Sequence, residues 1–364
     1  MLMSGKKSLY IHFPFCKKKC PYCHFFVLPD KADGQKLWLE GVKKELQLYQ
    51  IEDPLTIYFG GGTPSLMPPD FVAELMRGSP EEVTLEINPE SITKEKLKAF
   101  KNAGINRCSL GVQSLQKEEL ILLGREHPPD KVEEVLYMLA DVGFENISID
   151  LMYDVPGQTF ESLKKSLNAL LKLPFTHLSL YNLTIEPHTS FYKRRTELEK
   201  MRPPAEVSQE QFLFVRERLL EAGFEHYEIS AFAKKGFRAI HNSGYWLGRE
   251  FYGIGPSSFS FLDGVRRQNI AHLEKWSKAI EKGEKPIALE DHLPQEERLL
   301  ELFAVHLRWL DGIDLEAFQQ KWGKLPSRTF KTLDKLASLG LIEKGPKLTL
   351  KGLLVFDEIA VDLL

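Results

Sequence analysis

The 364-residue sequence has few cysteines, little net charge and no long apolar run, and each shortage excludes a class of protein. Its four cysteines do not form the spread-out disulfide framework of a small secreted protein. The formal net charge is −3, so no global basic field attracts nucleic acid or anionic lipid. No stretch approaches the roughly 18 consecutive apolar residues of a membrane span. Residues 1–7 include basic side chains but no apolar segment follows, so we expect no secretory signal and a cytoplasmic location.

Strand-like apolar runs alternate with helical patterns over the first half of the chain. The strand-like runs are 8–15, 55–59, 83–87, 105–112, 147–153 and 177–183. The helical patterns are 33–50, 93–102, 129–143 and 159–172. Six strands that alternate with helices predict an α/β fold with a parallel sheet, closed or nearly closed into a barrel. In such barrels the active site lies at the carboxyl ends of the strands.

The pattern loosens after residue 187 and changes again near residue 294. A helix over 209–223 and a strand over 224–232 are expected first. Three helices and a hairpin then predict a small winged-helix-like α+β domain, over 296–309, 315–322, 327–339 and 341–350. From Ile287 onward there are 13 acidic and 10 basic residues, which argues against DNA binding. We divide the chain into a barrel core, its continuation and the C-terminal domain, over 1–190, 191–290 and 291–364.

Three of the four cysteines form a C-x3-C-x2-C motif on the loop that leaves the first strand. Cys16, Cys20 and Cys23 can ligate three irons of a [4Fe-4S] cluster and leave the fourth iron open for another ligand. The alternative is a zinc ion held by these thiolates and a histidine, with His24 or His12 as candidates. Cys108 lies in a strand-like stretch, where a free cysteine usually behaves as a small buried hydrophobe.

Further motifs accompany the cysteines. The segment Tyr10-Ile-His-Phe-Pro-Phe-Cys16 leads into the cysteine motif, and Gly60-Gly-Gly-Thr-Pro64 follows it. Together they resemble the oxygen-independent coproporphyrinogen III oxidase branch of the radical S-adenosylmethionine (SAM) superfamily, over nearly the whole chain. The oxidases of that branch carry another cysteine two residues after the third, where this chain has Phe25. The heme-chaperone subgroup, HemW, carries an H-N-x-x-Y-W motif, which residues 241–246 match.

The resemblance implies a partial (β/α)6-type radical SAM barrel in which SAM binds the open iron of the cluster. It implies that Arg125 binds the carboxylate of SAM and that Asp150 binds the ribose hydroxyls. A guanidinium is chemically suited to a carboxylate, and a carboxylate is suited to accept from hydroxyl groups. Core packing explains three of the assigned side chains equally well, those of Tyr10, Tyr22 and Thr184. The full set of implied SAM contacts is Tyr10, Tyr22, Gly61, Gly62, Thr63, Glu86, Gln113, Arg125, Asp150 and Thr184.

The resemblance also implies a function in heme handling. His241 would be an axial ligand of heme iron, although a His-Asn pair can also simply hold a loop, and His226 and His127 are other candidates. The first hypothesis is a heme chaperone, with an electron donor such as flavodoxin or ferredoxin and a heme-acceptor protein as partners. A membrane-associated acceptor is among the candidates, and the chain would be a monomer or a heme-dependent dimer. The alternative is oxidative decarboxylation of coproporphyrinogen III, an activity that we do not expect.

Overall fold

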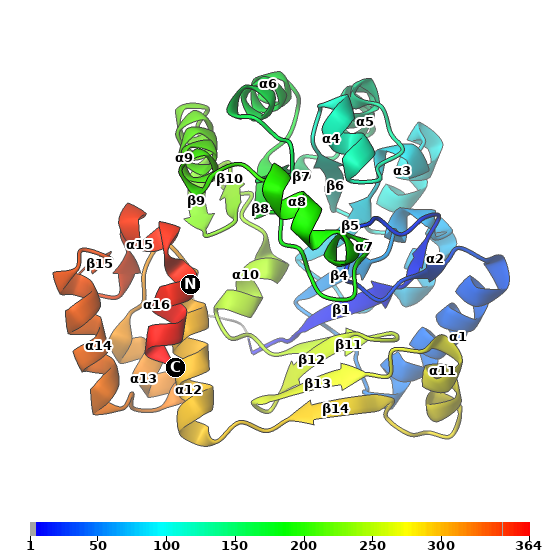
Figure 1. Cartoon of the computed structure of the whole chain (residues 1–364). Helices are drawn as coiled ribbons and strands as arrows, with labels where there is room; N and C mark the ends of the chain where they lie inside the picture. The colour runs from blue at the N-terminus through cyan, green and yellow to red at the C-terminus, as the bar shows by residue number, and fades with distance from the viewer. Residues whose placement is uncertain (1–4, 344) are drawn as a thin grey trace.

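The computed structural model describes residues 5–343 and 345–364, and a 12-stranded mixed sheet is its central element (Figure 1). In sheet order the strands are β14 (Ile287–Asp291), β13 (Val265–Asn269), β12 (Phe259–Leu262), β11 (Phe251–Ile254), β1 (Ser8–Phe13), β4 (Thr56–Gly61), β5 (Glu82–Ile87), β6 (Arg107–Gln113), β7 (Asn146–Tyr153), β8 (His177–Asn182), β10 (Ala231–Ala233) and β9 (Glu225–Glu228). The six predicted strands are its centre.

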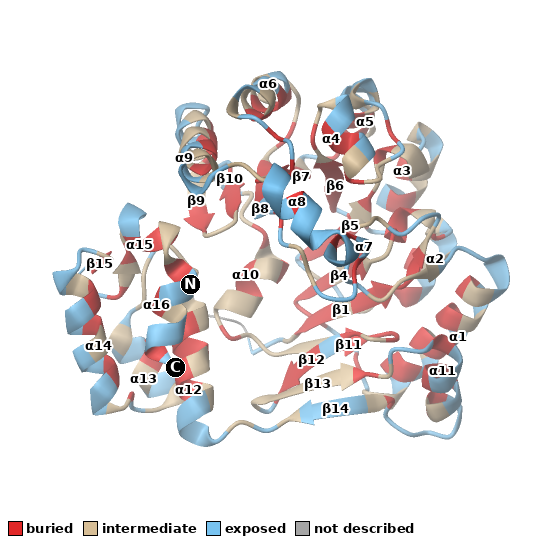
Figure 2. Cartoon of the chain, viewed as in Figure 1, coloured by how far each residue is buried: buried red, intermediate tan, exposed pale blue. Residues whose placement is uncertain are grey.

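The predicted parallel sheet is confirmed. Each of β1, β4, β5, β6, β7 and β8 pairs in parallel with the next. Within the described residues the sheet does not close on itself: β8 pairs antiparallel with β10, and β1 pairs on its other side with β11. The barrel is therefore partial, and its central strands are buried almost along their full length, as expected for strands covered on both faces (Figure 2).

Helices cover the outer face of these strands, with their buried sides toward the sheet (Figures 1 and 2). The longer ones are α1 (Ala32–Leu48), α3 (Lys94–Asn102), α5 (Pro129–Val142), α6 (Phe160–Leu170) and α9 (Ala205–Glu221). In α6, a capping box begins the helix, because Thr159 and Ser162 each bond the other's backbone N–H. Leu163, Leu167 and Leu170 then recur on one side and are buried.

Shorter elements connect this framework. They are β2 (Phe15–Cys16), β3 (Leu28–Pro29), α2 (Pro69–Leu75), α4 (Lys117–Leu122), α7 (Ser190–Lys193), α8 (Arg195–Met201), α10 (Ile240–Trp246) and α11 (Leu273–Glu281), with single 3-10 turns at Pro64–Leu66 and Pro89–Ser91. The prediction of one strand over 224–232 is wrong. The chain there forms β9 and β10, joined by a tight turn in which Glu228 accepts from the N–H of Ser230 (3.1 Å).

The C-terminal part contains the predicted three helices and hairpin. They are α12 (Gln295–His306), α13 (Leu315–Trp322), α14 (Ser327–Ser338), β15 (Ile342–Glu343) and β16 (Lys347–Leu348); Lys344, which the prediction included, lies outside the described residues. Two further helices were not predicted, α15 (Leu350–Leu354) and α16 (Phe356–Leu363). Ile359 of α16 packs with Phe303 and Leu336 in a second hydrophobic core. No helix in the described residues is both long and apolar enough to cross a bilayer.

Candidate functional site

A cavity of about 430 Å³ lies at the carboxyl ends of the central strands. It contains the three cysteines of the loop, together with the end residues of several strands. Among its lining residues are Cys16, Cys20, Cys23, Tyr22, Gly61, Gly62, Thr63, Glu86, Gln113, Arg125, Asp150 and Thr184. The fold thus brings most of the predicted cluster and SAM residues to one place, although they are spread over nearly 170 positions of the sequence.

The base of the cysteine loop is fixed by a buried histidine. The Nε2–H of His12 donates to the carbonyl of Phe26 (3.0 Å), and its Nδ1 therefore accepts from the hydroxyl of Tyr10 (3.0 Å). Burial lowers the pKa of His12 to about 4, so the ring is neutral. Because both nitrogens of His12 are bonded within the protein, it is not available as a fourth zinc ligand. The other candidate, His24, is exposed and lies against Phe25 with ring centroids 4.6 Å apart.

The three thiols of the loop are only partly exposed to solvent. Burial raises the pKa of Cys16 to about 11, although Thr63 Oγ1 donates to its sulfur (3.4 Å), and burial also raises the pKa of Cys23. Without iron these two thiols are protonated at neutral pH. Iron must therefore displace protons, which makes cluster assembly more favourable as the pH rises.

The glycine segment lies directly on the strand that leads into the cysteine loop. The N–H of Gly62 donates to Phe13 O (2.7 Å), and the N–H of Thr63 donates to Phe15 O (2.8 Å). A Cβ at Gly62 would stand 2.6 Å from the carbonyl oxygen of Phe15, so any side chain there would force the two segments apart. The absence of a Cβ therefore serves this contact as well as any contact with a ligand.

Two half-buried carboxylates face the cavity. Glu86 accepts from the hydroxyl of Tyr58 (2.9 Å) and from the N–H of Gly61 (3.1 Å), and burial raises its pKa to about 7. Asp150 accepts from the hydroxyl of Ser109 (3.4 Å), and burial raises its pKa to about 6. Buried carboxylates without a cationic partner are costly. A ligand that carries a positive charge and hydroxyl groups would compensate for that cost.

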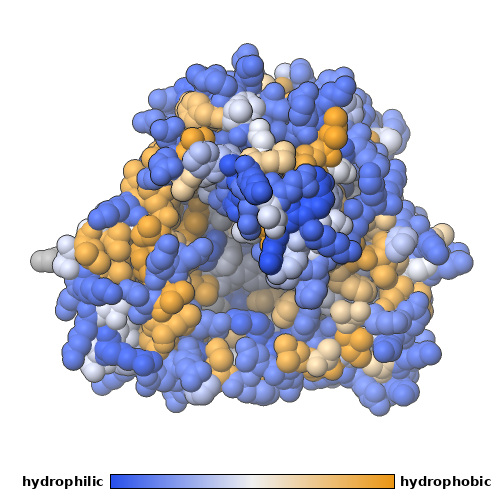
Figure 3. Space-filling view, in the orientation of Figure 1, coloured by the Kyte–Doolittle hydropathy of each residue, from blue (hydrophilic) through white to orange (hydrophobic). Residues whose placement is uncertain are grey.

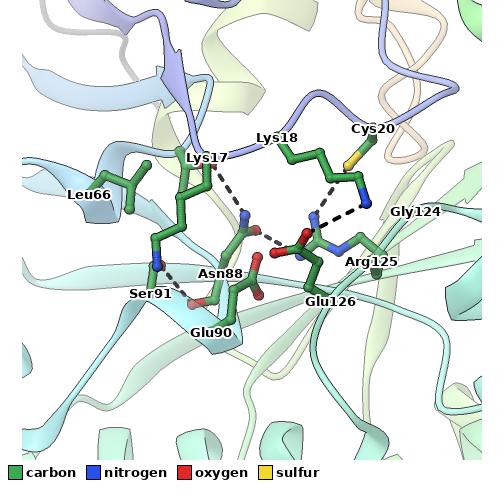
Figure 4. Close-up of a pocket in the computed structure, with 11 residues that line it drawn as sticks. Lys17, Lys18, Cys20, Leu66, Asn88, Glu90, Ser91, Gly124, Arg125 and Glu126 are labelled. Atoms are coloured by element: carbon green, nitrogen blue, oxygen red, sulfur yellow. Dashed lines mark hydrogen bonds and ion pairs between the residues drawn. The ribbon is translucent and has the colours of Figure 1, made fainter. Parts of the chain in front are cut away.

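Arg125 joins the cysteine loop to two strands. Its Nη2 donates to Asn88 Oδ1 (2.8 Å) and to Gly111 O (2.9 Å), and its Nη1 lies 4.0 Å from Cys20 Sγ. Figure 4 shows the guanidinium between Cys20 and Asn88. The Nε of Arg125 is buried without a hydrogen-bond partner in the described structure. The side chain is therefore a fixed positive charge beside the cluster loop.

Gln113 ends β6 in a strained conformation. Its φ is +65°, a left-handed value that costs a non-glycine residue roughly 1–3 kcal/mol. The register of β6 against β7 shifts between Gly111 and Gln113, which marks a bulge at this point. Such bulges re-aim a side chain, and Gln113 lines the cavity.

Tyr10 and His241 are not brought to the cavity lining. Tyr10 stacks on Tyr58 in the barrel interior, with ring centroids 6.0 Å apart. His241 is only 1% exposed, and its Nδ1 and Nε2 lie 2.8 Å from Thr56 Oγ1 and from Tyr245 Oη. Thr56 begins β4, so His241 lies at the end of the barrel opposite the cysteines. Both ring nitrogens therefore have hydrogen-bond partners within the protein, and a role of His241 as a heme ligand stays a prediction.

The sequence interpretation missed several polar residues of the site. Asn88 holds Arg125, and Ser109, Tyr181 and Asn182 also line the cavity. Alternate residues of a strand face the same side, and Asn88 lies two positions after Glu86 while Ser109 lies two positions before Gly111. This spacing is a weak indication that Asn88 and Ser109 face the cavity. Their role depends on how neighbouring strands stand in register, which a single sequence does not show.

A second and larger cleft adjoins the cavity. It measures about 980 Å³ and shares Asn182 and Thr184 with the cavity lining. One wall belongs to the barrel edge and the other to α15, α16 and the turn between them. Figure 3 shows apolar side chains gathered on the surface where α9 and β9 face α15 and α16. The lining also includes charged side chains of both signs, among them Asp154, Glu199, Arg202, Arg308, Asp357 and Glu358. Its apolar residues are Leu180, Pro203, Ala205, Phe212, Ile229, Leu353, Leu354, Val355 and Phe356.

Comparison with known proteins agrees with this architecture. The radical SAM superfamily model matches residues 10–170, and the HemN C-terminal domain model matches residues 293–355. The heme chaperone HemW of Bacillus subtilis is 33% identical over 373 residues, which cover 97% of this chain and 98% of the relative. The chain belongs to the HemW family. HemW of Lactococcus lactis is also 33% identical, over 88% of this chain and 86% of the relative.

A solved structure shows the same fold as this HemW family member. Coproporphyrinogen III oxidase (HemN) from Escherichia coli, described as a radical SAM enzyme, covers 99% of this chain and 91% of its own. The TM-score is 0.85 at 22% sequence identity. At this identity the likeness extends to the fold and not to the reaction.

Membership of the radical SAM superfamily implies a [4Fe-4S] cluster and SAM, and the residues present fit both. Three thiols from one loop face the same cavity, as a three-cysteine cluster requires. Arg125 supplies a positive charge for a carboxylate, and Glu86 and Asp150 supply acceptors for an amino group and hydroxyls. Cys108 is fully buried and lies outside this set.

Proposed function

We propose that this HemW family member is a radical SAM heme chaperone: it binds heme and passes it to an acceptor protein. The proposal is supported by relatives that are named heme chaperones and match 88% and 97% of the chain. The observation that carries it in the structure is the cleft, because it has room for a tetrapyrrole and opens beside the cysteine cavity. When bound at the three cysteines, a [4Fe-4S] cluster supplies one electron to SAM. The chain's own residues hold and orient SAM.

The lining of the cleft suits an iron porphyrin with two propionates. Its apolar side chains offer contact area for the ring, and burial of apolar area is the main source of binding free energy for such a ligand. Arg308 lines the cleft, and its guanidinium can donate to a propionate there, although its Nη2 already donates to Ser230 Oγ (3.1 Å) and lies 3.8 Å from Glu228 Oε2. Tyr153 also lines the cleft, and tyrosine is a known type of axial heme ligand.

The coproporphyrinogen dehydrogenase alternative has less support. Phe25, at the position of the further cysteine in the oxidases, is 52% exposed and lines the cysteine cavity. Radical decarboxylation would also require each propionate to be placed within about 3–3.5 Å of the reacting centre. Retention and release of heme need an apolar cleft and an iron ligand, but do not require the propionates to be placed at a reacting centre.

Heme titration of cleft variants tests the proposed location. Leu354→Glu places a charge in the apolar wall, and we expect heme affinity to fall about tenfold or more, since one charge against a buried apolar ligand costs at least 1.4 kcal/mol. The matched control is Leu350→Glu, at a 45% exposed position of the same helix that does not line the cleft. Equal affinities of the two variants by Soret absorbance would show that heme binds elsewhere.

The same titration separates the candidates for the iron ligand. In His241→Gln the Soret maximum should stay at the wild-type position, because His241 is enclosed by Thr56 and Tyr245. In Tyr153→Phe the maximum should move. A shifted band in the His241 variant with an unchanged band in the Tyr153 variant would return the ligand role to His241.

A further inference from the structure

A buried arginine lies below the cysteine cavity, inside the barrel. Arg107 is the first residue of β6 and is only 1% exposed. Alternate residues of a strand face the same side, so Arg107 faces the same side as Ser109 and Gly111, which line the cavity. Cys108 faces the opposite side and belongs to the main hydrophobic core. The guanidinium of Arg107 therefore lies in the barrel interior, beneath the residues that line the cavity.

The guanidinium of Arg107 lacks close partners. Its Nε and Nη1 are buried and have no hydrogen-bond partner in the part of the chain that the structure describes. Glu82 of β5 faces the same interior, but its two oxygens accept from the N–H groups of Ile240 and His241 (2.8 and 2.9 Å). A buried charge is costly unless opposite charges compensate for it. Arg107 thus supplies a positive charge that other groups of the barrel interior can balance.

The strand register places two carboxylates on the cavity side of Arg107. Glu86 of β5 pairs with Ser109, two positions along β6 from Arg107. Asp150 of β7 pairs with Gly111, two positions farther along. Burial raises the pKa of Glu86 to about 7 and that of Asp150 to about 6, and the charge of Arg107 opposes both rises. Without this charge, both carboxyls would be protonated to a greater extent at neutral pH.

We propose that Arg107 is a positioning residue of the SAM site. Its positive charge keeps the carboxyls of Glu86 and Asp150 ionised, so that they can accept from the amino group and the hydroxyls of SAM. Arg107 is not among the residues that line the cavity, so it acts on SAM through the two carboxylates. This role requires SAM to bind in the cavity, but it does not depend on the proposed chaperone function.

Other ionisable groups face Arg107 and the two carboxyls from the surrounding elements. They are Tyr10, Cys23, Tyr58, Glu82, Arg125, His177, Tyr181, Tyr227, His241 and Tyr245. Desolvation raises the pKa of the tyrosines and of the cysteine and lowers that of the two histidines, so these groups do not titrate near neutral pH. The titration of SAM itself is common to all variants. A difference in pH profile between two variants therefore reports on Glu86 and Asp150.

Calorimetric titration of the anaerobically reconstituted protein with SAM at several pH values tests this role. In Arg107→Gln the pKa of both carboxyls should rise by about one unit, because an opposite charge is lost. Both are then more protonated at about pH 7, so SAM affinity there should be about tenfold below that of the wild type. At about pH 8.5 both are ionised again, and the affinity should be within about twofold of wild type. Arg107→Lys keeps the charge and should follow the wild-type profile.

Arg249→Gln is the matched control. Arg249 Nη1 donates to Ser8 Oγ (3.3 Å) and to Ile240 O (2.9 Å), at the end of the barrel opposite the cysteines. Its Nε, like that of Arg107, is buried without a hydrogen-bond partner among the described residues. This variant also loses a guanidinium, but at a position remote from the cavity, and its SAM profile should match that of the wild type.

Iron content and circular dichroism show which variants fold. If Arg107→Gln loses its iron, Arg107→Lys decides alone: a wild-type profile supports the role of the charge, and a shifted profile overturns it. A wild-type profile in Arg107→Gln, or a loss of affinity that persists at about pH 8.5, would also overturn the proposal. Heme titration of the same variants reports separately on the chaperone function, since Arg107 does not line the heme cleft.

Discussion

The Cys20→Ala protein should leave anaerobic reconstitution with almost none of the roughly four irons per chain that the wild type acquires. Cys20 faces the cavity with Cys16 and Cys23, and two thiolates on one loop do not retain a cluster whose assembly depends on three. SAM should then no longer alter an EPR signal, because no reducible cluster remains. Iron assay and EPR of the reduced protein measure both effects.

Cys108→Ala is the control for this loss. Cys108 is fully buried in β6, and burial raises its pKa well above the ordinary value, so it is an inert thiol far from a ligand role. Its variant should retain wild-type iron, with only the modest destabilisation of a small cavity. Wild-type iron content in Cys20→Ala, or equal losses in the two variants, would contradict the assignment of the cluster.

Asp150→Asn should reduce SAM affinity about tenfold or more while iron content stays unchanged. The substitution keeps the size of the side chain and removes the charge, and charge-assisted hydrogen bonds are worth roughly 1.5–3 kcal/mol each. Burial raises the pKa of Asp150 to about 6, so the wild-type carboxyl is protonated below that pH and ionised above it. SAM affinity of the wild type should therefore rise with pH through about 6, and part of this rise should disappear in the variant.

Calorimetric titration of SAM at pH 5.5 and 7.5, on about equal cluster loadings, measures this pH effect. The remaining dependence in Asp150→Asn belongs to Glu86, whose pKa is raised to about 7 by burial. Asp141→Asn, a substitution on the exposed outer side of α5, serves as the control. An unchanged SAM affinity in Asp150→Asn would mean that the carboxylate only supports the barrel through Ser109.

The central sheet could be predicted because its strands are continuous apolar runs separated by helical patterns. Buried parallel strands have this signature, and it placed all six within a few residues of their positions. The turn between β9 and β10 was missed because no glycine, proline or asparagine marks Glu228-Ile-Ser230. The last two helices were missed because both are short and depend on packing more than on local pattern: α16 packs against α12 and α14, and α15 packs against α16 and β16.

The cysteine part of the candidate site could be predicted because three cysteines at this spacing on one loop are typical of a metal centre, either an iron-sulfur cluster or, with a histidine, zinc. The fold places them in one cavity with Glu86, Arg125 and Asp150. The burial of His241 could not be predicted, because the H-N-x-x-Y-W pattern carries no information on burial. In the structure, the backbone N–H groups of Ile240 and His241 donate to Glu82 (2.8 and 2.9 Å), which fixes the start of α10 inside the barrel.

As a heme chaperone, this chain should bind heme and should not convert coproporphyrinogen III. The most direct test supplies the reconstituted protein, SAM and a reductant with coproporphyrinogen III or with heme, under anaerobic conditions, and analyses both reactions by HPLC and absorbance. We expect unchanged coproporphyrinogen III in the first reaction, and in the second a shifted Soret band from heme that stays chemically intact. SAM-dependent formation of protoporphyrinogen IX at enzyme-like rates, with no shift of the heme band, would rule out the chaperone function.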